Sequence, residues 1–333
     1  MVYQPVHPRK VLGVKVHDTI KERQEKRNVT KGNTEVHVKG SKIEFLVPNI
    51  DNFVETEQVK RITERIMRWI KIGYPPHIIG PTGCGKTTLA LAVANKVGRP
   101  TLWINGDDEM TTSNLIGGYS EIETSSVRDR YIHRVIIAKD SSKYTWVDNP
   151  LTIACKQGYT LIYNEFSRAR PVANNVLLSV LEEGILELPI IFGEERYVKV
   201  HPDFSIIFTS NSIEYAGVHR PQDALLDRLV HIYMDYYDFD TEVEIVAIHT
   251  GLPAEEAERI VRAVRVIRER MPRELKPGTR AAIMIGKGLN AMGDHSNDTL
   301  RQICSDVLAS KIGDSNDFSK QATLIEDVLL EVY

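Results

Sequence analysis

Residues 80–88 bring together glycines, threonines and one lysine at a spacing that suits the binding of phosphate groups. They fit the pattern G-x-x-x-x-G-K-[ST], in which glycines let the backbone turn tightly and aim its N–H groups at phosphate oxygens. Lys86 then reaches the β- and γ-phosphates, and the Thr87 hydroxyl is a ligand for Mg²⁺. The residues expected to bind nucleotide are Gly80, Pro81, Thr82, Gly83, Cys84, Gly85, Lys86, Thr87 and Thr88. The sequence therefore predicts a site for a nucleoside triphosphate.

The segments on either side give this loop the surroundings that the pattern requires. A short apolar run at residues 77–79 precedes it as a strand, and a helical pattern over residues 88–97 follows it. The N-terminus of that helix adds partial positive charge where phosphate would lie. Such a loop on its own is equally compatible with a kinase, a GTPase or a motor, so further elements must decide.

The second element is an apolar strand at residues 160–165 that ends in two polar residues. In a P-loop ATPase this strand end carries an Asp for the Mg²⁺ shell, followed by a Glu that polarises the attacking water. Here the first position is Asn164, whose amide oxygen still accepts a bond from a magnesium-bound water but brings no negative charge. Glu165 is the candidate general base. Asn164 and Thr87 are thus the expected metal-binding residues.

Three further polar residues are placed where they would complete the chemistry. Asn211 ends the next strand and is expected to orient the attacking water. Arg228 closes a short helix before the fifth strand, at an edge from which it would serve a neighbouring subunit as an arginine finger. Arg280 begins a helix farther along and would reach back to the phosphates. For each arginine, a surface ion pair is the alternative interpretation.

Short strands and helices alternate along the middle of the chain, which predicts an α/β fold with a parallel sheet and flanking helices. The expected strands are 77–79, 102–104, 161–163, 206–209 and 230–234. Strands stop after Asp240, and a smaller all-α lid domain is expected to follow. We therefore predict a basic flexible arm over residues 1–48, a nucleotide-binding domain over 49–240 and a lid over 241–333.

Two local patterns define the expected lid. Thr241 and Glu244 form a capping box that would open its first helix. The next helix, residues 254–271, carries an apolar face and would expose Arg262, Arg265 and Arg268 to solvent.

Composition sets limits on the partners and the compartment. The formal net charge is −3, which gives no bulk attraction to nucleic acid or to an anionic membrane. No run approaches the length of a membrane-spanning helix, so no membrane insertion is expected. The three cysteines lie far apart, which favours reduced thiols and a cytoplasmic protein over a disulfide framework or a zinc site.

The ordered elements together resemble the AAA+ ATPases, and specifically their MoxR-like branch. The nucleotide-binding loop, the 161–165 strand, Asn211, Arg228 and Arg280 sit where that class has its Walker A, Walker B, sensor 1, arginine finger and sensor 2. A closer resemblance, to the gas vesicle GvpN family, spans about residues 52–290. It is carried by residues 105–107, 148–155, 165–171, 174–184, 201–217 and 222–228.

This resemblance implies an ATPase that uses ATP and Mg²⁺, forms a ring that is expected to be a hexamer, and acts on other gas vesicle proteins. Two insertions typical of the MoxR-like group, around residues 131–147 and 184–200, would face the pore or a partner, or be ordinary surface hairpins. Asn164 stands where this class usually has an Asp, so we expect an altered affinity for Mg²⁺ and a slow ATPase.

Three alternatives remain open at this point. A MoxR-like activator of another enzyme would share the same ATPase core, although residues 174–179 and 214–217 favour the gas vesicle group. A nucleotide-regulated scaffold with little turnover is supported by Asn164 alone. A DNA motor is disfavoured because the net charge is negative and the basic arm lacks interleaved aromatics.

Overall fold

A five-stranded parallel sheet forms the centre of the protein, in the strand order β11-β3-β10-β7-β4. The computed structural model describes residues 33–38, 41–48, 50, 52–131, 135–189, 196–212, 219–271, 275–308, 323 and 326–328. The strands of the central sheet are β3 (Pro76–Gly80), β4 (Thr101–Asn105), β7 (Thr160–Asn164), β10 (Ser205–Asn211) and β11 (Val230–Tyr233). The α/β fold expected from the alternating pattern is confirmed, and all five strands lie within two residues of the expected ranges.

Both faces of this sheet are buried, because successive side chains of each strand point to opposite sides. Leu161 and Tyr163 of β7 pack into one apolar cluster, whereas Ile162 between them packs into another. The second cluster is covered by α2 (Glu57–Lys71) and α3 (Lys86–Val97). The first is covered by α4 (Thr112–Ile116), α5 (Pro150–Gln157), the 3₁₀ turn η2 (Phe166–Arg168), α6 (Val176–Glu182) and α7 (Asp223–Leu226). A second 3₁₀ turn, η3 (Pro171–Asn174), contacts α4 and α6.

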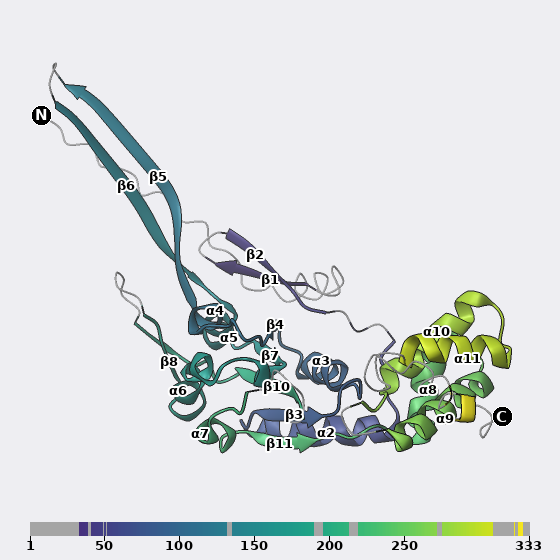
Figure 1. Cartoon of the computed structure of the whole chain (residues 1–333). Coiled ribbons are helices and arrows are strands. Elements are labelled where there is room, and N and C mark those ends of the chain that lie inside the picture. Colours follow the sequence, from purple (N-terminus) through teal and green to yellow (C-terminus); the bar gives the residue numbers. More distant parts are fainter. Residues whose placement is uncertain are drawn as a thin grey trace, which may run out of the picture.

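Three antiparallel hairpins are added to this core. The longest pairs β5 (Gly117–Tyr131) with β6 (Val135–Asp148), and Figure 1 shows it projecting far from the sheet. Shorter hairpins pair β8 (Ile185–Glu187) with β9 (Tyr197–Lys199), and β1 (Asn33–Val38) with β2 (Ser41–Leu46). Both insertions expected from sequence are hairpins, and the first begins earlier than expected.

The expected N-terminal arm needs a correction in its second half. Residues 33–38 and 41–46 pair as a hairpin, although no strand pattern was expected there. The first 32 residues of the arm lie outside the described residues.

Among the described residues, helices alone follow the sheet. They are α8 (Phe239–Thr250), α9 (Ala254–Arg270), α10 (Thr279–Met292) and α11 (Asn297–Leu308), and they share one apolar cluster. Figure 1 shows them grouped at one end of the sheet, on the opposite side from α6 and α7. The last strand ends at Tyr233, so a short hinge, residues 234–238, connects the sheet to this helical lid.

The start of α8 and the exposed face of α9 both differ from expectation. Asp238 is the N-cap of α8, and its carboxylate accepts a hydrogen bond from the Thr241 backbone N–H. Thr241 and Glu244 therefore lie inside the helix instead of opening it, because the acidic residue three positions earlier satisfies the free N–H group. On α9, Arg268 is buried instead of exposed.

Among the described helices, none is long and apolar enough to span a bilayer.

Candidate active site

The nucleotide-binding loop connects the end of β3 to the start of α3. Gly85 is the N-cap of α3 and has φ 92°, a conformation that favours glycine, and no side chain caps the helix there. The first N–H groups of α3 are therefore available to a ligand, as phosphate binding requires. The other loop residues differ in their burial. Cys84 is buried, Pro81, Thr82 and Thr87 are half-buried, and Thr88 is exposed.

Lys86 lies at the centre of the site and is buried. Its ammonium donates to the carbonyl oxygens of Gly80 and Pro81 at 3.0 and 2.7 Å, and to Asn211 Oδ1 at 2.9 Å. The Asn211 amide in turn donates to Glu165 Oε2 at 2.8 Å. Burial lowers the pKa of Lys86. The structure thus brings together the expected phosphate-binding lysine, the sensor amide and the candidate base.

Asn164 is the centre of a second group of contacts, beside the first. Its Oδ1 accepts from the hydroxyls of Thr87 at 3.0 Å and Thr209 at 2.8 Å. Its amide donates to Asn105 Oδ1 at 2.9 Å, across the pairing of β7 with β4. The two residues expected to bind metal therefore touch each other. Asn105 and Thr209 had no role assigned from sequence, although each ends or nearly ends a strand next to β7.

Glu165 adopts a backbone conformation that costs energy. Its φ of 53° and ψ of 39° lie in the left-handed region, where a non-glycine residue costs about 1 kcal/mol. The backbone N–H of Glu165 donates to Thr209 Oγ1 at 3.3 Å, and the carboxylate lies 3.6 Å from Arg168 Nε. β7 ends at Asn164, and the turn at Glu165 places its side chain within hydrogen-bond distance of Asn211.

A cavity of about 390 Å³ lies next to the loop, of a size that suits a nucleoside. It is formed where the segment before α2, the start of α3 and the helical lid meet. Phe53, Val54, Tyr237 and Ile283 give it apolar walls, and Arg280 lies at its rim on α10. These wall residues were not expected from sequence, because they come from segments far apart in the chain and follow no motif.

The two arginines expected from sequence occupy different places. Arg280 projects from the lid toward the loop, and its Cβ lies 3.6 Å from where a Cβ on Gly83 would be. Arg228 lies apart from this site and pairs with Glu182 of α6 and with the Ala224 carbonyl. Figure 1 shows α6 and α7 at the end of the sheet away from the lid.

A chain of polar side chains runs across β10, β3 and β11, with His77 and Ser210 buried and His231 half-buried, and it was not expected. His77 of β3 lies 2.7 Å from Ser210 Oγ and 3.1 Å from His231 Nδ1, and these residues line a cavity of about 720 Å³. Burial, together with His231, lowers the pKa of His77 to about 3. His77 is therefore neutral at physiological pH.

Burial also decides the state of the loop cysteine. It raises the pKa of the Cys84 thiol, and this effect outweighs the nearby Lys86. Cys84 consequently acts as a small apolar residue of the core and not as a reactive thiol.

A phosphate loop, a Lys86–Asn211–Glu165 chain and a parallel sheet followed by a helical lid define an AAA+ ATPase. Residues 77–229 match the family described as AAA domain (dynein-related subfamily).

The relatives identify the branch. The chain is 52% identical to "Gas vesicle ATPase GvpN" of Haloferax mediterranei, over 93% of this chain and 92% of that protein. It is 54% identical to "Gas vesicle ATPase GvpN1" of Halobacterium salinarum, over 89% and 84% of the two chains. "Protein CbbQ" of Hydrogenophilus thermoluteolus is more distant, with 28% identity over 56% and 62%. This chain belongs to the gas vesicle ATPase GvpN family, as its resemblance implied.

The low pKa of His77 predicts how stability changes with pH. An unfolded histidine has a pKa of about 6.5, so above that pH His77 is neutral in both states. As the pH falls from 6.5 toward 3, the unfolded chain binds a proton that the folded chain excludes, and stability is lost. At pH 5 the loss due to this one group approaches about 2 kcal/mol.

The measurement is the free energy of unfolding in urea at pH 7 and pH 5, for wild type and His77→Gln. We expect the wild type to lose more stability than the variant over this interval. Equal losses in the two proteins would show that His77 is protonated in the folded state.

Proposed function

We propose that this ATPase assembles into a ring, a hexamer, and uses ATP hydrolysis to remodel or assemble gas vesicle proteins in the cytoplasm. Membership of the gas vesicle ATPase family supports the setting. The observation that carries the hydrolytic part is the hydrogen-bond chain from Lys86 through Asn211 to Glu165. It connects the phosphate-binding lysine to a carboxylate through a single amide.

In this proposal the reaction is an in-line attack of water on the γ-phosphate. Lys86 turns from its present carbonyl acceptors to the β- and γ-phosphate oxygens, which carry full charge and bind an ammonium more strongly. That movement frees Asn211 Oδ1 to accept a hydrogen bond from the attacking water, while its amide remains on Glu165. The Glu165 carboxylate then takes the proton of the water. Arg280 contacts the phosphates from the lid.

The residues at the mouth of the loop fit Mg²⁺ held mainly by the nucleotide. Thr87 and Asn164 offer two neutral oxygens that already lie 3.0 Å apart. Within the described residues, no group of three His, Cys, Asp or Glu side chains is arranged to hold a metal. Mg²⁺ commonly keeps several waters and binds through phosphates and few protein ligands, so this donor set is sufficient. When bound, the ion neutralises charge that develops on the phosphate oxygens.

Arg228 is proposed to act on the site of a neighbouring subunit. Arg228 lies apart from the phosphate loop of the same chain. The Arg228 side chain is 27% exposed, at the edge formed by α6 and α7. In a ring, such an edge meets the next nucleotide site. The guanidinium would there stabilise the charge of the transition state.

The clients are proposed to be other gas vesicle proteins, contacted through the β5–β6 and β8–β9 hairpins. Figure 1 shows both hairpins extending from the α4–α6 side of the sheet, away from the lid. No role in DNA binding or membrane insertion is proposed.

Two other functions have a specific observation behind them. A MoxR-like activator of another enzyme is favoured only by the distant similarity to CbbQ. A scaffold with little turnover is favoured by the neutral Asn164, whose amide and carbonyl are both already engaged.

Glu165→Gln tests the proposed base. The amide cannot take a proton, so we expect kcat for ATP hydrolysis to fall by about 10²-fold or more while ATP binding is retained. Glu64→Gln, on an exposed face of α2, is the matched control and is expected to be unchanged. Full activity in Glu165→Gln would overturn the assignment. A wild type that binds ATP but turns it over at background rates with client present would favour the scaffold.

The same variant tests the biological role. In cells that form gas vesicles, Glu165→Gln in place of the wild-type chain is expected to abolish vesicle formation, scored by light scattering. Because the variant binds ATP without hydrolysing it, we also expect it to stay bound to its clients and to co-purify with gas vesicle proteins. Normal vesicles with this variant would contradict the proposal.

Asn164→Asp tests the metal site. A carboxylate at this position keeps the hydrogen bonds from Thr87 and Thr209 and adds a negative charge beside the phosphates. We expect the Mg²⁺ concentration for half-maximal ATPase activity to fall severalfold. Asn105→Asp places the same charge on the partner residue of β4 and serves as the control for non-specific attraction. An unchanged Mg²⁺ dependence in Asn164→Asp would place the ion elsewhere.

Mixing two inactive variants tests the finger. Arg228→Ala alone is expected to lose about 10³-fold or more in kcat. Mixed with Glu165→Gln subunits, it should regain activity, because its intact site then receives Arg228 from a neighbour. A mixture of Lys86→Ala with Glu165→Gln is the control and is expected to stay inactive, since each change disables the site of the subunit that carries it. A mixture no more active than its separate components would contradict action between subunits.

A further inference from the structure

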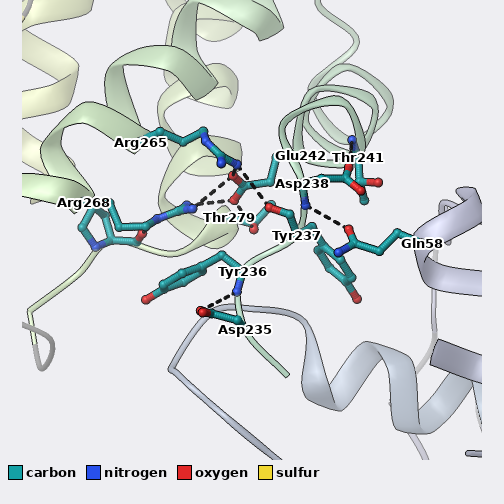
Figure 2. A network of polar contacts seen from close by, with 11 residues as sticks. Gln58, Asp235, Tyr236, Tyr237, Asp238, Thr241, Glu242, Arg265, Arg268 and Thr279 are labelled. Carbon is teal, nitrogen blue, oxygen red and sulfur yellow. Dashed lines mark hydrogen bonds and ion pairs between the residues drawn. The ribbon is translucent and has the colours of Figure 1, made fainter. Parts of the chain in front are cut away.

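A single buried carboxylate, Glu242 of α8, lies at the centre of the lid. It is 1% exposed, and the side chain of Arg268 on α9 is 8% exposed. Figure 2 shows Arg265, Arg268 and Thr279 converging on this carboxylate from two further segments. Sequence periodicity assigned both arginines to solvent, whereas Arg268 is buried and Arg265 is half-buried. This difference calls for a physical explanation.

The contacts of Glu242 are close and use both of its oxygens. Arg268 donates through Nη2 to Oε1 at 2.8 Å and through Nη1 to Oε2 at 3.1 Å. Arg265 Nη1 donates to Oε2 at 2.9 Å, and the Thr279 hydroxyl donates to Oε1 at 2.8 Å. Charge-assisted and bidentate bonds of this kind are stronger and more directional than neutral ones. We call these four residues the Glu242 network.

The arginines of the network also hold the backbone on both sides of the nucleotide loop. Arg268 Nε donates to the Pro277 carbonyl at 2.8 Å, and its guanidinium lies 3.9 Å from the centre of the Tyr236 ring. Arg265 Nη1 donates to the Tyr237 carbonyl at 3.2 Å. The network therefore fixes the hinge at residues 236–237 and the segment at residues 277–279 relative to each other.

Both of these segments touch the nucleotide-binding loop directly. A Cβ placed on Gly278 would lie 2.8 Å from backbone atoms of Gly83 and Thr82, so only glycine allows this approach. The Tyr237 ring also lies close to the loop, at 3.3 Å from a Cβ placed on Gly85. Arg280 follows Thr279 by one residue. The position of Arg280 is thus set by the same contacts that seat the lid on the loop.

We propose that Glu242 is a positioning residue that holds Arg280 and the lid against the bound triphosphate, through the Thr279 hydroxyl and the two arginines. The inference rests on the proposed role of Arg280. Glu242 does not touch the nucleotide itself; it determines the distance at which the lid closes on the loop. The network lies on the lid side of the loop, whereas Asn211 and Glu165 lie at the end of the sheet strands. Its loss therefore weakens ATP binding and leaves the chemical step little changed.

Thr279→Val is the main test, because it removes the one hydrogen bond to Glu242 from an uncharged donor and leaves both arginines paired with the carboxylate. We expect the Kd for a fluorescent ATP analogue and the KM for ATP to rise about tenfold, in the range of typical coupling between sites. We expect kcat to change by less than about threefold and Thr279→Ser to restore binding. A purely structural role would lower the melting temperature and leave Kd unchanged.

Glu242→Gln is the stronger variant and keeps the shape of the side chain. We expect a larger increase in Kd than for Thr279→Val, because two arginines lose their counter-charge. Glu244→Gln, on the exposed face of the same helix, is the matched control and is expected to bind ATP as wild type does. An unchanged Kd in Thr279→Val and Glu242→Gln would overturn the proposal.

Arg280→Ala separates this inference from the proposed function. If Arg280→Ala binds ATP as wild type does, the role of Arg280 fails. If Arg280→Ala weakens binding and Thr279→Val does not, only the positioning role of Glu242 fails. If Arg280→Ala and Thr279→Val each weaken ATP binding, we expect the double variant to bind ATP little more weakly than Arg280→Ala alone, because the two residues act through one contact. Fully additive effects would show that Thr279 acts independently of Arg280 and would contradict the proposal.

Discussion

The buried ammonium of Lys86 is the constraint on which the rest of the site depends. A charge taken out of water must be met by acceptors, and three oxygens from the loop and from β10 meet it here. One of these oxygens belongs to Asn211, so satisfying the lysine also fixes the amide that holds Glu165. The order of the strands makes this possible, because β10 lies between β3 and β7, ends level with β3 and runs two residues past β7. A single requirement for charge compensation thus aligns three strand ends.

The parts of the site that follow strand ends were predictable from sequence. Asn164 and Glu165 come directly after an apolar run, and Lys86 and Asn211 follow runs that end at Ile79 and Phe208. The carboxyl ends of parallel strands meet at one edge of a sheet. The cavity walls were not predictable, because Phe53, Tyr237 and Ile283 are brought together only by the packing of the lid on the domain. Periodicity also misplaced Arg268, since a helical pattern identifies an apolar face but not a buried carboxylate on a neighbouring helix. Sequence pattern also missed Asp238 as the N-cap of α8, because its capping role depends on where the hinge ends.

Asn164 shows how a neutral residue fits a position where related ATPases use a carboxylate. Its carbonyl oxygen still accepts the two hydroxyls that an aspartate would accept, and its amide gains a partner in Asn105. An aspartate at position 164 would place a carboxylate oxygen against Asn105 Oδ1, so the Asn105 amide would have to rotate to donate its N–H. Both the oxygen and the amide of Asn164 thus have partners within the chain, and in the proposed function Mg²⁺ would compete with the Thr87–Asn164 contact. In the proposed cycle this makes metal binding depend on the triphosphate, which supplies the missing negative charge.

Two contacts connect the chemistry to movements of the chain, and they lie at opposite ends of the sheet. The Glu242 network seats the lid on the nucleotide loop, so closing the lid and binding phosphate are one event in the proposal. Arg228 at the other end is paired with Glu182 within its own chain, and in the proposed ring it would leave that partner to serve a neighbour. The Glu182 side chain is 59% exposed, so solvent screens this pair and the exchange would cost little in the proposed ring. Hydrolysis in the proposed ring would then require a neighbour on one side and a closed lid on the other, and a single subunit meets only the second condition.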